Sequence, residues 1–180
     1  MPKLPPGLLA PLPDAARLWL FAADRDLDAA EAAALLDRVR AFTAGWTSHA
    51  RPVPAAADLL LSRVLAVGAA IDESEVNAGV SGCGIDAMQH AVEAAAEAGG
   101  FAWLPPLAVL YRDDEGALQA VPRPDFRRLV RDGVVNAGTP VLDLTPTTVG
   151  ALRAGGVERA AGRSWHGRVF GLGEPVAAGA

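Results

Sequence analysis

Hydrophobic and polar positions along the first part of the chain predict strands and helices in turn. A run of large apolar residues at 17–22 predicts a strand. Residues 28–45 begin with Asp and have Glu three positions later, a capping-box pattern, and their apolar positions then recur at helical spacing. Two prolines make 46–58 a predicted loop. The strongest strand signal covers 59–71, and a second helix is predicted over 83–98.

The second part of the chain predicts shorter elements. Residues 105–111 and 117–121 flank an acidic turn with a glycine, which predicts a hairpin. A first-turn proline precedes a short predicted helix at 125–131. Residues 141–144 predict a short strand, and 147–154 predict another short helix.

This order of elements predicts an α+β fold. We expect a single antiparallel or mixed sheet with helices packed mainly on one face, and a ferredoxin-like arrangement is the topology that fits the order. Prolines at the start predict an extended arm over 1–15. Residues 16–172 are predicted to form one domain, and the Gly/Ala-rich end, 173–180, is predicted to be a flexible tail.

Composition narrows the class of partner. The formal net charge of -5 and the scattered acidic residues argue against a nucleic-acid partner. The longest apolar run, 64–71, has 8 residues, against the roughly 20 that a membrane-spanning helix needs, so we expect no membrane partner. A single cysteine excludes an internal disulfide, so a reducing compartment fits best and we expect a cytoplasmic protein.

Residues 81–86 hold the only thiol of the chain, Cys83, between Gly82 and Gly84 at a predicted helix start. Glycines there leave backbone amides uncovered, and these amides and the helix dipole favour a nearby anion. A thiolate is such an anion, so Cys83 is placed to act as a nucleophile. Two observations favour a structural role instead: cysteine is often buried as a small apolar residue, and Asp86 adds negative charge near the thiol.

A nucleophilic cysteine needs a base within hydrogen-bond reach. His49 is the predicted base, and Asp72, at the end of the long strand, is predicted to orient its ring. His90 lies roughly 10 Å of helix rise from Cys83 and is too far away, whereas His166 is an alternative base or a residue that caps the fold. The predicted catalytic residues are Cys83, His49 and Asp72, and the predicted binding residues are Ser81, Gly82, Gly84, Asp86 and Trp46.

Several familiar chemistries lack their motifs. Lys3 is the only lysine, so no glycine-rich phosphate loop ends in Lys followed by Ser or Thr. Gln89 stands where a Cys-x5-Arg phosphatase loop would need arginine. Cys-x-x-Cys, His-x-x-x-His and Gly-x-Ser-x-Gly patterns are also absent from the sequence. We therefore expect no cofactor and no metal; zinc held by His and carboxylates is the alternative, and no residue spacing supports it.

Five segments carry a family resemblance: 17–21 (RLWLF), 42–49 (FTAGWTSH), 71–73 (IDE), 81–86 (SGCGID) and 164–166 (SWH). Together they resemble a bacterial protein family recognised by a Ser-Gly-Cys-Ser-Ile-Asp segment and without an established activity, and the resemblance covers nearly the whole chain. Members are sometimes labelled as transporter ATPases, a label that the missing phosphate loop contradicts here. The chain departs from the family at Gly84, where Ser is usual, and at Ala50, where Gly is usual. The resemblance implies that Cys83 and Asp86 are the remaining polar members of the motif.

The leading hypothesis is a small-molecule binding or thiol-dependent site centred on Cys83 that takes a small polar metabolite. An enzyme of this kind would carry out acyl or amide chemistry, with helix-start amides stabilising an oxyanion. The alternative is a non-catalytic structural or protein-interaction domain in which residues 81–86 are architectural. A redox sensor is a third reading, since a lone accessible thiol can be oxidised reversibly. The sequence leaves open whether the protein is an enzyme, and it sets no oligomeric state.

Overall fold

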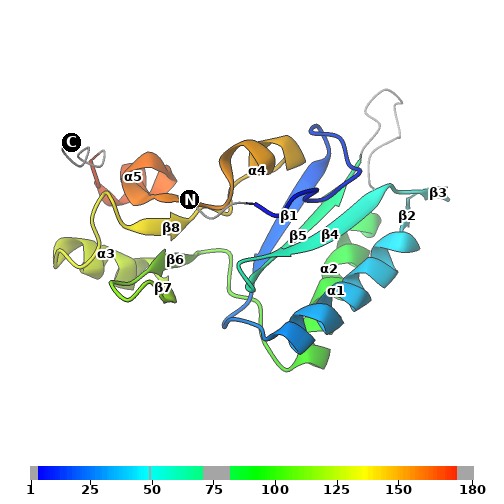
Figure 1. Cartoon of the computed structure of the whole chain (residues 1–180), viewed down its shortest axis with the longest axis horizontal. Helices are drawn as coiled ribbons and strands as arrows, with labels where there is room; N and C mark the ends of the chain where they lie inside the picture. Colours follow the sequence, from blue (N-terminus) through cyan, green and yellow to red (C-terminus); the bar gives the residue numbers. More distant parts are fainter. Residues whose placement is uncertain (1–3, 49, 71–81, 174–180) are drawn as a thin grey trace. The chain divides into compact units, whose positions relative to one another are not determined.

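The computed structural model describes residues 4–48, 50–70 and 82–173. The fold is α+β, as predicted, and the strands pair antiparallel (Figure 1). The described strands form three sheets, where the sequence predicted one. Contacts group the chain into a first unit, Leu4–Leu104 with Thr145–Gly155, and a second unit, Pro105–Leu144 with the chain from Gly156 onward.

This division differs from the predicted single domain over 16–172. The physical reason is that each group of strands closes over its own set of buried side chains, one in each unit. Composition does not change at the boundaries, and their only local signs are the pairs Pro105-Pro106 and Gly155-Gly156. The predicted tail, 173–180, lies almost entirely outside the described residues.

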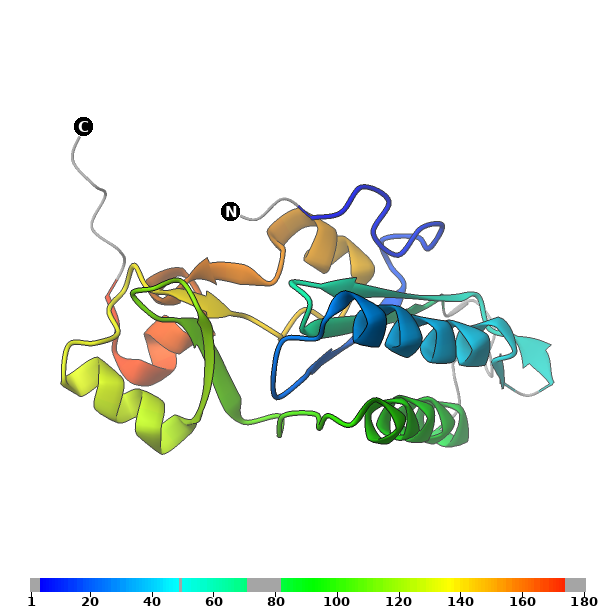
Figure 2. The same ribbon diagram turned by 60° about the horizontal axis from the view of Figure 1, so that its bottom comes forward.

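The first unit is built on a three-stranded sheet in the order β1-β5-β4. Strand β5 (Val64–Ala69) lies between β1 (Arg17–Ala22) and β4 (Ala55–Leu60) and is antiparallel to both. Helices α1 (Ala29–Ala44) and α2 (Gly82–Gly99) pack side by side on one face of this sheet (Figures 1 and 2). The helix α1 therefore connects two strands that run parallel with a third between them.

A short bridge completes the order of the first unit. After α2 the chain returns beside β1, where Ala23 pairs antiparallel with Trp103. The unit thus follows the β-α-β-β-α-β order of the predicted ferredoxin-like arrangement, with the last strand reduced to one bridge. A small hairpin, β2 (Thr47–Ser48) with β3 (Arg51–Pro52), is inserted before β4.

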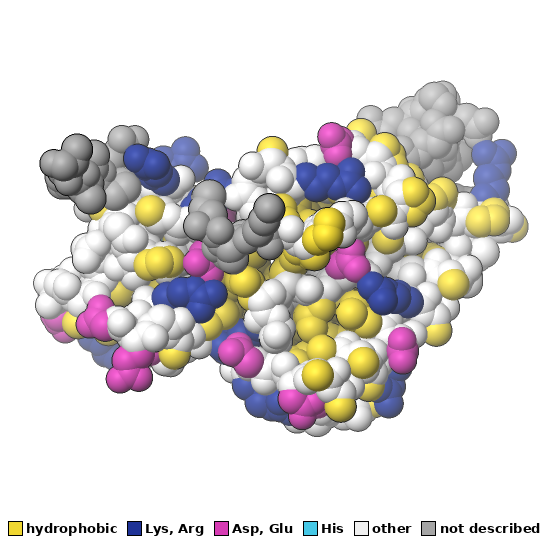
Figure 3. Space-filling model, viewed as in Figure 1, with side chains coloured by type: hydrophobic (Ala, Val, Ile, Leu, Met, Phe, Trp, Pro, Cys, Tyr) yellow, Lys and Arg dark blue, Asp and Glu magenta, His cyan; other side chains and the backbone are white. Residues whose placement is uncertain are grey.

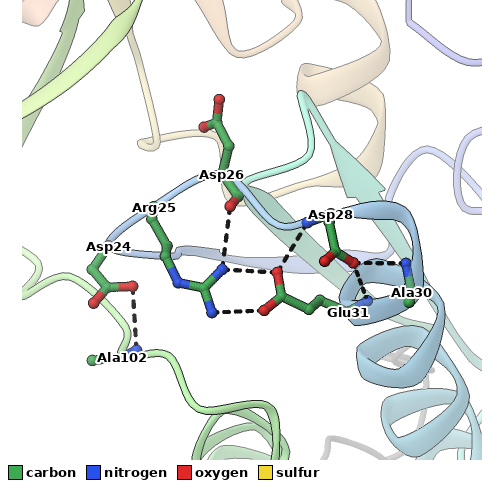
Figure 4. A network of polar contacts seen from close by, with 7 residues as sticks. All are labelled: Asp24, Arg25, Asp26, Asp28, Ala30, Glu31 and Ala102. Atoms are coloured by element: carbon green, nitrogen blue, oxygen red, sulfur yellow. Dashed lines mark hydrogen bonds and ion pairs between the residues drawn. The ribbon is translucent and has the colours of Figure 1, made fainter.

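Helix α1 begins with the capping box that the sequence predicted (Figure 4). The Asp28 carboxylate accepts from the amides of Ala30 and Glu31, and the Glu31 carboxylate accepts from the amide of Asp28. Arg25 donates to the same Glu31 carboxylate at 2.7 and 2.8 Å. Two hydrogen bonds lower the pKa of Glu31 to about 2: the bond from Arg25 has the larger effect and the bond from the Asp28 amide the smaller. Gly45 caps the other end of the helix.

The opposite face of the first sheet is covered by residues 4–15 and α4 (Val149–Gly155). A Cβ atom built on Gly68 of β5 would lie 2.6 Å from Leu12 Cδ1 and 3.2 Å from Val149 Cγ2, so the glycine lets these two side chains pack closely against the strand. The predicted extended arm is instead a series of turns over its described part. Its buried side chains are Leu8, Leu9 and Leu12. Burial of these leucines against β5 and α4 accounts for the difference.

Arg153 of α4 holds this N-terminal segment. Its guanidinium donates to the carbonyl oxygens of Leu8 and Leu12 at 3.0 Å, and it pairs with the Asp14 carboxylate at 2.7 Å. Backbone carbonyls in turns lack ladder partners, so a side-chain donor that satisfies two of them stabilises the segment. Arg153, late in the sequence, therefore helps to hold the N-terminal segment in its folded conformation.

The second unit contains a four-stranded antiparallel sheet in the order β7-β6-β8-β9. Its strands are β6 (Ala108–Arg112), β7 (Leu118–Pro122), β8 (Pro140–Leu142) and β9 (Glu158–Ala160). Helices α3 (Arg123–Arg131) and α5 (Trp165–Phe170) contribute to its core, and a 3-10 turn, η1 (Ala161–Arg163), precedes α5. Phe126 is fully buried and contacts the rings of Tyr111 and Phe170. This aromatic cluster is the core of the unit.

Candidate functional site

Cys83 is exposed and lies in the first turn of α2, at the helix start that the sequence predicted. The helix begins at Gly82, so Cys83 is its second residue. Amides in the first turn of a helix have no acceptor inside the helix. Gly82 is also exposed, and a Cβ atom built there would meet no atom of the described residues within 4 Å. The thiol is therefore an exposed group in the first turn of the helix.

The inner face of α2 explains why the thiol points outward. Gly84, Met88 and Val92 are buried, and their four-residue spacing keeps them on one face of the helix. Cys83 and Asp86 fall outside that stripe, and both are exposed. Of the predicted binding residues at the helix start, Gly84 is therefore buried and Asp86 is exposed.

Trp46, predicted to contact a ligand, lies in the core of the first unit with 4% of its surface exposed. Its ring centroid is 5.3 Å from that of Phe42 and 6.2 Å from that of Trp19. Its Nε1 atom is buried and makes no hydrogen bond with any residue that the structure describes. The indole serves as packing, and its N–H is a buried donor without a partner in that part of the chain.

The remaining predicted site residues, His49, Asp72 and Ser81, lie outside the described residues. Their grouping around Cys83 therefore stays a prediction. His90 is described, and it is an exposed residue of α2. Of the predicted set, the structure brings only Gly82, Cys83, Gly84 and Asp86 together, through their shared turn of helix.

A second group of polar side chains lies in the second unit, around His166. The imidazole is 1% exposed, and its Nδ1 atom is 2.8 Å from Ser164 Oγ. The hydroxyl donates its one hydrogen to the carbonyl of Ala161 at 2.9 Å, so Nδ1 is the donor in the contact with Ser164. The ring of Trp165 stacks on the imidazole at a centroid distance of 3.8 Å. Ser164 also caps α5 by accepting from the backbone amide of His166.

Burial lowers the pKa of His166 to about 4, because the cluster removes water that would stabilise the imidazolium. The negative charge of Asp143 acts in the opposite direction, and the positive charge of Arg123 adds to the lowering. Asp143 is itself buried, and its Oδ2 is 3.5 Å from Arg159 Nε. His166 is consequently neutral near pH 7.

His166 was predicted as an alternative base or as a residue that caps the fold, whereas Asp143 and Arg159 were not predicted. The Ser-x-His spacing at 164–166 is a signal for a capped helix start, and it could have indicated that the serine hydroxyl serves the histidine. No local pattern links Asp143 or Arg159 to that turn, because β8 and β9 bring them close only in the folded sheet. The hydroxyl of Ser164 is used to cap α5. We therefore interpret the buried polar side chains around His166 as groups that help to specify the fold.

Two further observations concern metal binding and membrane-spanning helices. The described residues contain no group of three or more His, Cys, Asp or Glu side chains arranged to hold a metal ion. None of the described helices has both the length and the apolar character required to cross a membrane.

Comparisons with protein-family models, with curated proteins and with solved structures each found no match. The resemblance to the Ser-Gly-Cys family therefore stays an expectation from the sequence.

Proposed function

We propose that this chain carries a thiol-dependent site for a small polar molecule, centred on Cys83. The observation that supports it is the exposure of the only thiol at the start of an 18-residue helix. The amides and dipole of the first turn stabilise a thiolate and, equally, an anionic group of a bound molecule. Ser81, Gly82 and Asp86 supply polar contacts around the thiol in this proposal, and the family resemblance points to the same segment.

The chemistry that suits this arrangement is acyl transfer from an amide or ester. The thiolate attacks the carbonyl carbon to form a C–S bond, and the resulting oxyanion accepts from first-turn amides. The C–N or C–O bond then breaks, the leaving amine or alcohol takes a proton, and water hydrolyses the thioester to an acid and the free thiol. In this proposal His49 transfers the protons and Asp72 orients its ring.

The rate of alkylation of Cys83 tests the proposal. We expect iodoacetamide at pH 7 to modify Cys83 about three- to tenfold faster than an ordinary exposed thiol, because in this proposal the helix start stabilises the negative charge on the attacking sulfur. The matched control is Ala87→Cys in a Cys83→Ser background. Position 87 is exposed on the same helix, one turn further from its N-terminus. Mass spectrometry of the intact protein gives both rates.

Equal rates at the two positions would contradict the proposal. The architectural alternative predicts a different result, because it requires Cys83 for stability. We expect the Cys83→Ser variant to unfold within about 0.5 kcal/mol of the original chain in urea, as exposed positions usually do. A loss of 2 kcal/mol or more, with ordinary alkylation, would support the architectural alternative.

We further propose a bacterial cytoplasmic location, without a nucleic-acid, membrane or cofactor partner. A lone exposed thiol suits a reducing compartment. The acidic net charge of -5 argues against a phosphate backbone as the partner.

A further inference from the structure

Helix α3 carries two arginines whose charge is not balanced by a neighbouring carboxylate. Arg123 and Arg127 are exposed and one helical turn apart, and neither forms an ion pair with a residue that the structure describes. The other two arginines of the helix, Arg128 and Arg131, are paired. Their partners are Asp125, at 2.6 Å, and Asp132, at 3.2 Å. One edge of α3 is therefore neutralised and the other keeps two free positive charges.

Aromatic rings hold both free guanidinium groups in place. Arg123 lies over Trp165 at 5.0 Å from the ring centroid, and Arg127 lies over Phe170 at 5.9 Å. A guanidinium stacked on a ring keeps its N–H groups, which lie in its own plane, available to an acceptor. Because stacking already restricts these side chains, less conformational entropy is lost when an acceptor binds.

We propose that this arginine pair binds an acidic peptide segment of a partner protein. A guanidinium matches a carboxylate through two parallel hydrogen bonds. Four residues of helix rise by about 6 Å, so the pair fits two carboxylates one helical turn apart or on alternate residues of an extended strand. Val169, which precedes Phe170 in α5, is an exposed apolar residue (48%). The proposal does not depend on the role of Cys83.

A nucleic acid fits this surface less well than an acidic peptide. Binding of single strands relies on bases that stack on open aromatic faces. Here Trp165 is already covered by the imidazole of His166, at 3.8 Å, and by the guanidinium of Arg123. On the face of the molecule shown in Figure 3, arginine and acidic side chains are interspersed and form no long basic strip. A phosphate backbone requires such a strip.

The test measures binding of a fluorescein-labelled twelve-residue peptide rich in Asp and Glu, by fluorescence anisotropy at low salt. The double variant Arg123→Gln/Arg127→Gln should bind this peptide at least tenfold more weakly than the original chain. The control, Arg128→Gln/Arg131→Gln, removes the same formal charge from the same helix, yet it should change binding less than threefold because those charges are already paired.

A second peptide, with Asn and Gln in place of Asp and Glu, tests whether binding depends on the carboxylates. The original chain should bind this neutral peptide at least tenfold more weakly than the acidic one. Absence of acidic-peptide binding, equal losses in the two double variants, or equal affinity for the neutral peptide would each overturn the proposal. Tighter binding of a single-stranded twelve-nucleotide DNA than of the acidic peptide would also overturn it.

Discussion

A single buried imidazole links the stability of the second unit to pH. His166 is packed between Trp165 and the rings of Phe126 and Phe170, and its Nδ1 donates to Ser164. The neutral ring fits this environment, since it has a hydrogen-bond partner and no charge to hydrate. Protonation would place a cation where burial disfavours it, and the nearby Asp143 offsets only part of that cost.

We predict that the second unit loses stability as the pH falls below about 6.5. Folding lowers the pKa of His166 from 6.5 to about 4, so in this window the unfolded chain binds a proton that the folded chain excludes. The contribution is fully present above 6.5 and is lost as the pH approaches 4. Between pH 7 and pH 5 the loss is on the order of 2 kcal/mol. Hydrogen exchange of amides in residues 161–172, measured at both pH values, reports it.

The His166→Asn variant provides the control for this prediction. Its amide can still donate to Ser164, but it does not titrate. The variant should have lower stability at pH 7, from lost packing, and a much smaller change between the two pH values. If both proteins lose the same stability on acidification, His166 is not the group responsible.

At the level of elements, α5 approaches η1 too closely for any side chain at Gly167. A Cβ atom there would lie 2.7 Å from the carbonyl oxygen of Gly162 and 3.0 Å from its carbonyl carbon. These are backbone atoms, so they cannot move aside as the end of a side chain would. The glycine at position 167 therefore sets how tightly the short helix folds back on the turn before it.

We predict that Gly167→Ala destabilises the second unit by about 2–3 kcal/mol, as overpacking of a tight contact does. The sign is informative, because alanine in place of glycine inside an open helix normally stabilises by up to about 1 kcal/mol. Urea unfolding monitored by circular dichroism measures the change. Gly173→Ala is the matched control, since nothing lies within 4 Å of its Cβ position, and it should change stability by less than about 0.5 kcal/mol. If Gly167→Ala instead stabilises the protein, η1 moves to make room for the methyl group and the prediction is wrong.

The elements that the sequence predicted well are those with local signals. The capping box at Asp28 and Glu31 and the helix end at Gly45 depend on residues within one turn, and all three are confirmed. The predicted long strand over 59–71 is wrong, because the chain reverses between β4 and β5. The reversal uses Leu61 and Ser62, both with φ of 54°, where turns of this hand usually have Gly or Asn. Without that signal, the apolar run was indistinguishable from one strand.

On the scale of the whole molecule, sequence reasoning failed where distant segments meet. The start of α2 could be predicted, because the helical spacing of its apolar residues begins there. Two units could not be predicted, since the first unit is interrupted by 105–144 and resumes at Thr145. The ion pair of Asp143 with Arg159 was missed for the same reason.

Arg153 shows how strongly the first unit depends on its late segment, Thr145–Gly155. It contacts the carbonyls of Leu8 and Leu12 and the carboxylate of Asp14, across more than 130 residues of chain. We predict that Arg153→Ala lowers the stability of the N-terminal segment by about 1–3 kcal/mol, because the two carbonyls lose a charged donor and the segment loses its attachment to α4. Hydrogen exchange should accelerate in residues 8–14 before it changes in α1.

The comparison with Arg38 separates this attachment from a general effect of removing an arginine. Arg38 is exposed on α1, and in the described part of the chain it bonds only to the carbonyl of Ala34, within its own helix. Arg38→Ala should therefore leave exchange in residues 8–14 unchanged and shift stability by less than about 0.5 kcal/mol. If Arg153→Ala behaves like Arg38→Ala, the buried leucines alone hold the N-terminal segment on the sheet. If it accelerates exchange there selectively, a residue near the end of the chain determines how its beginning folds.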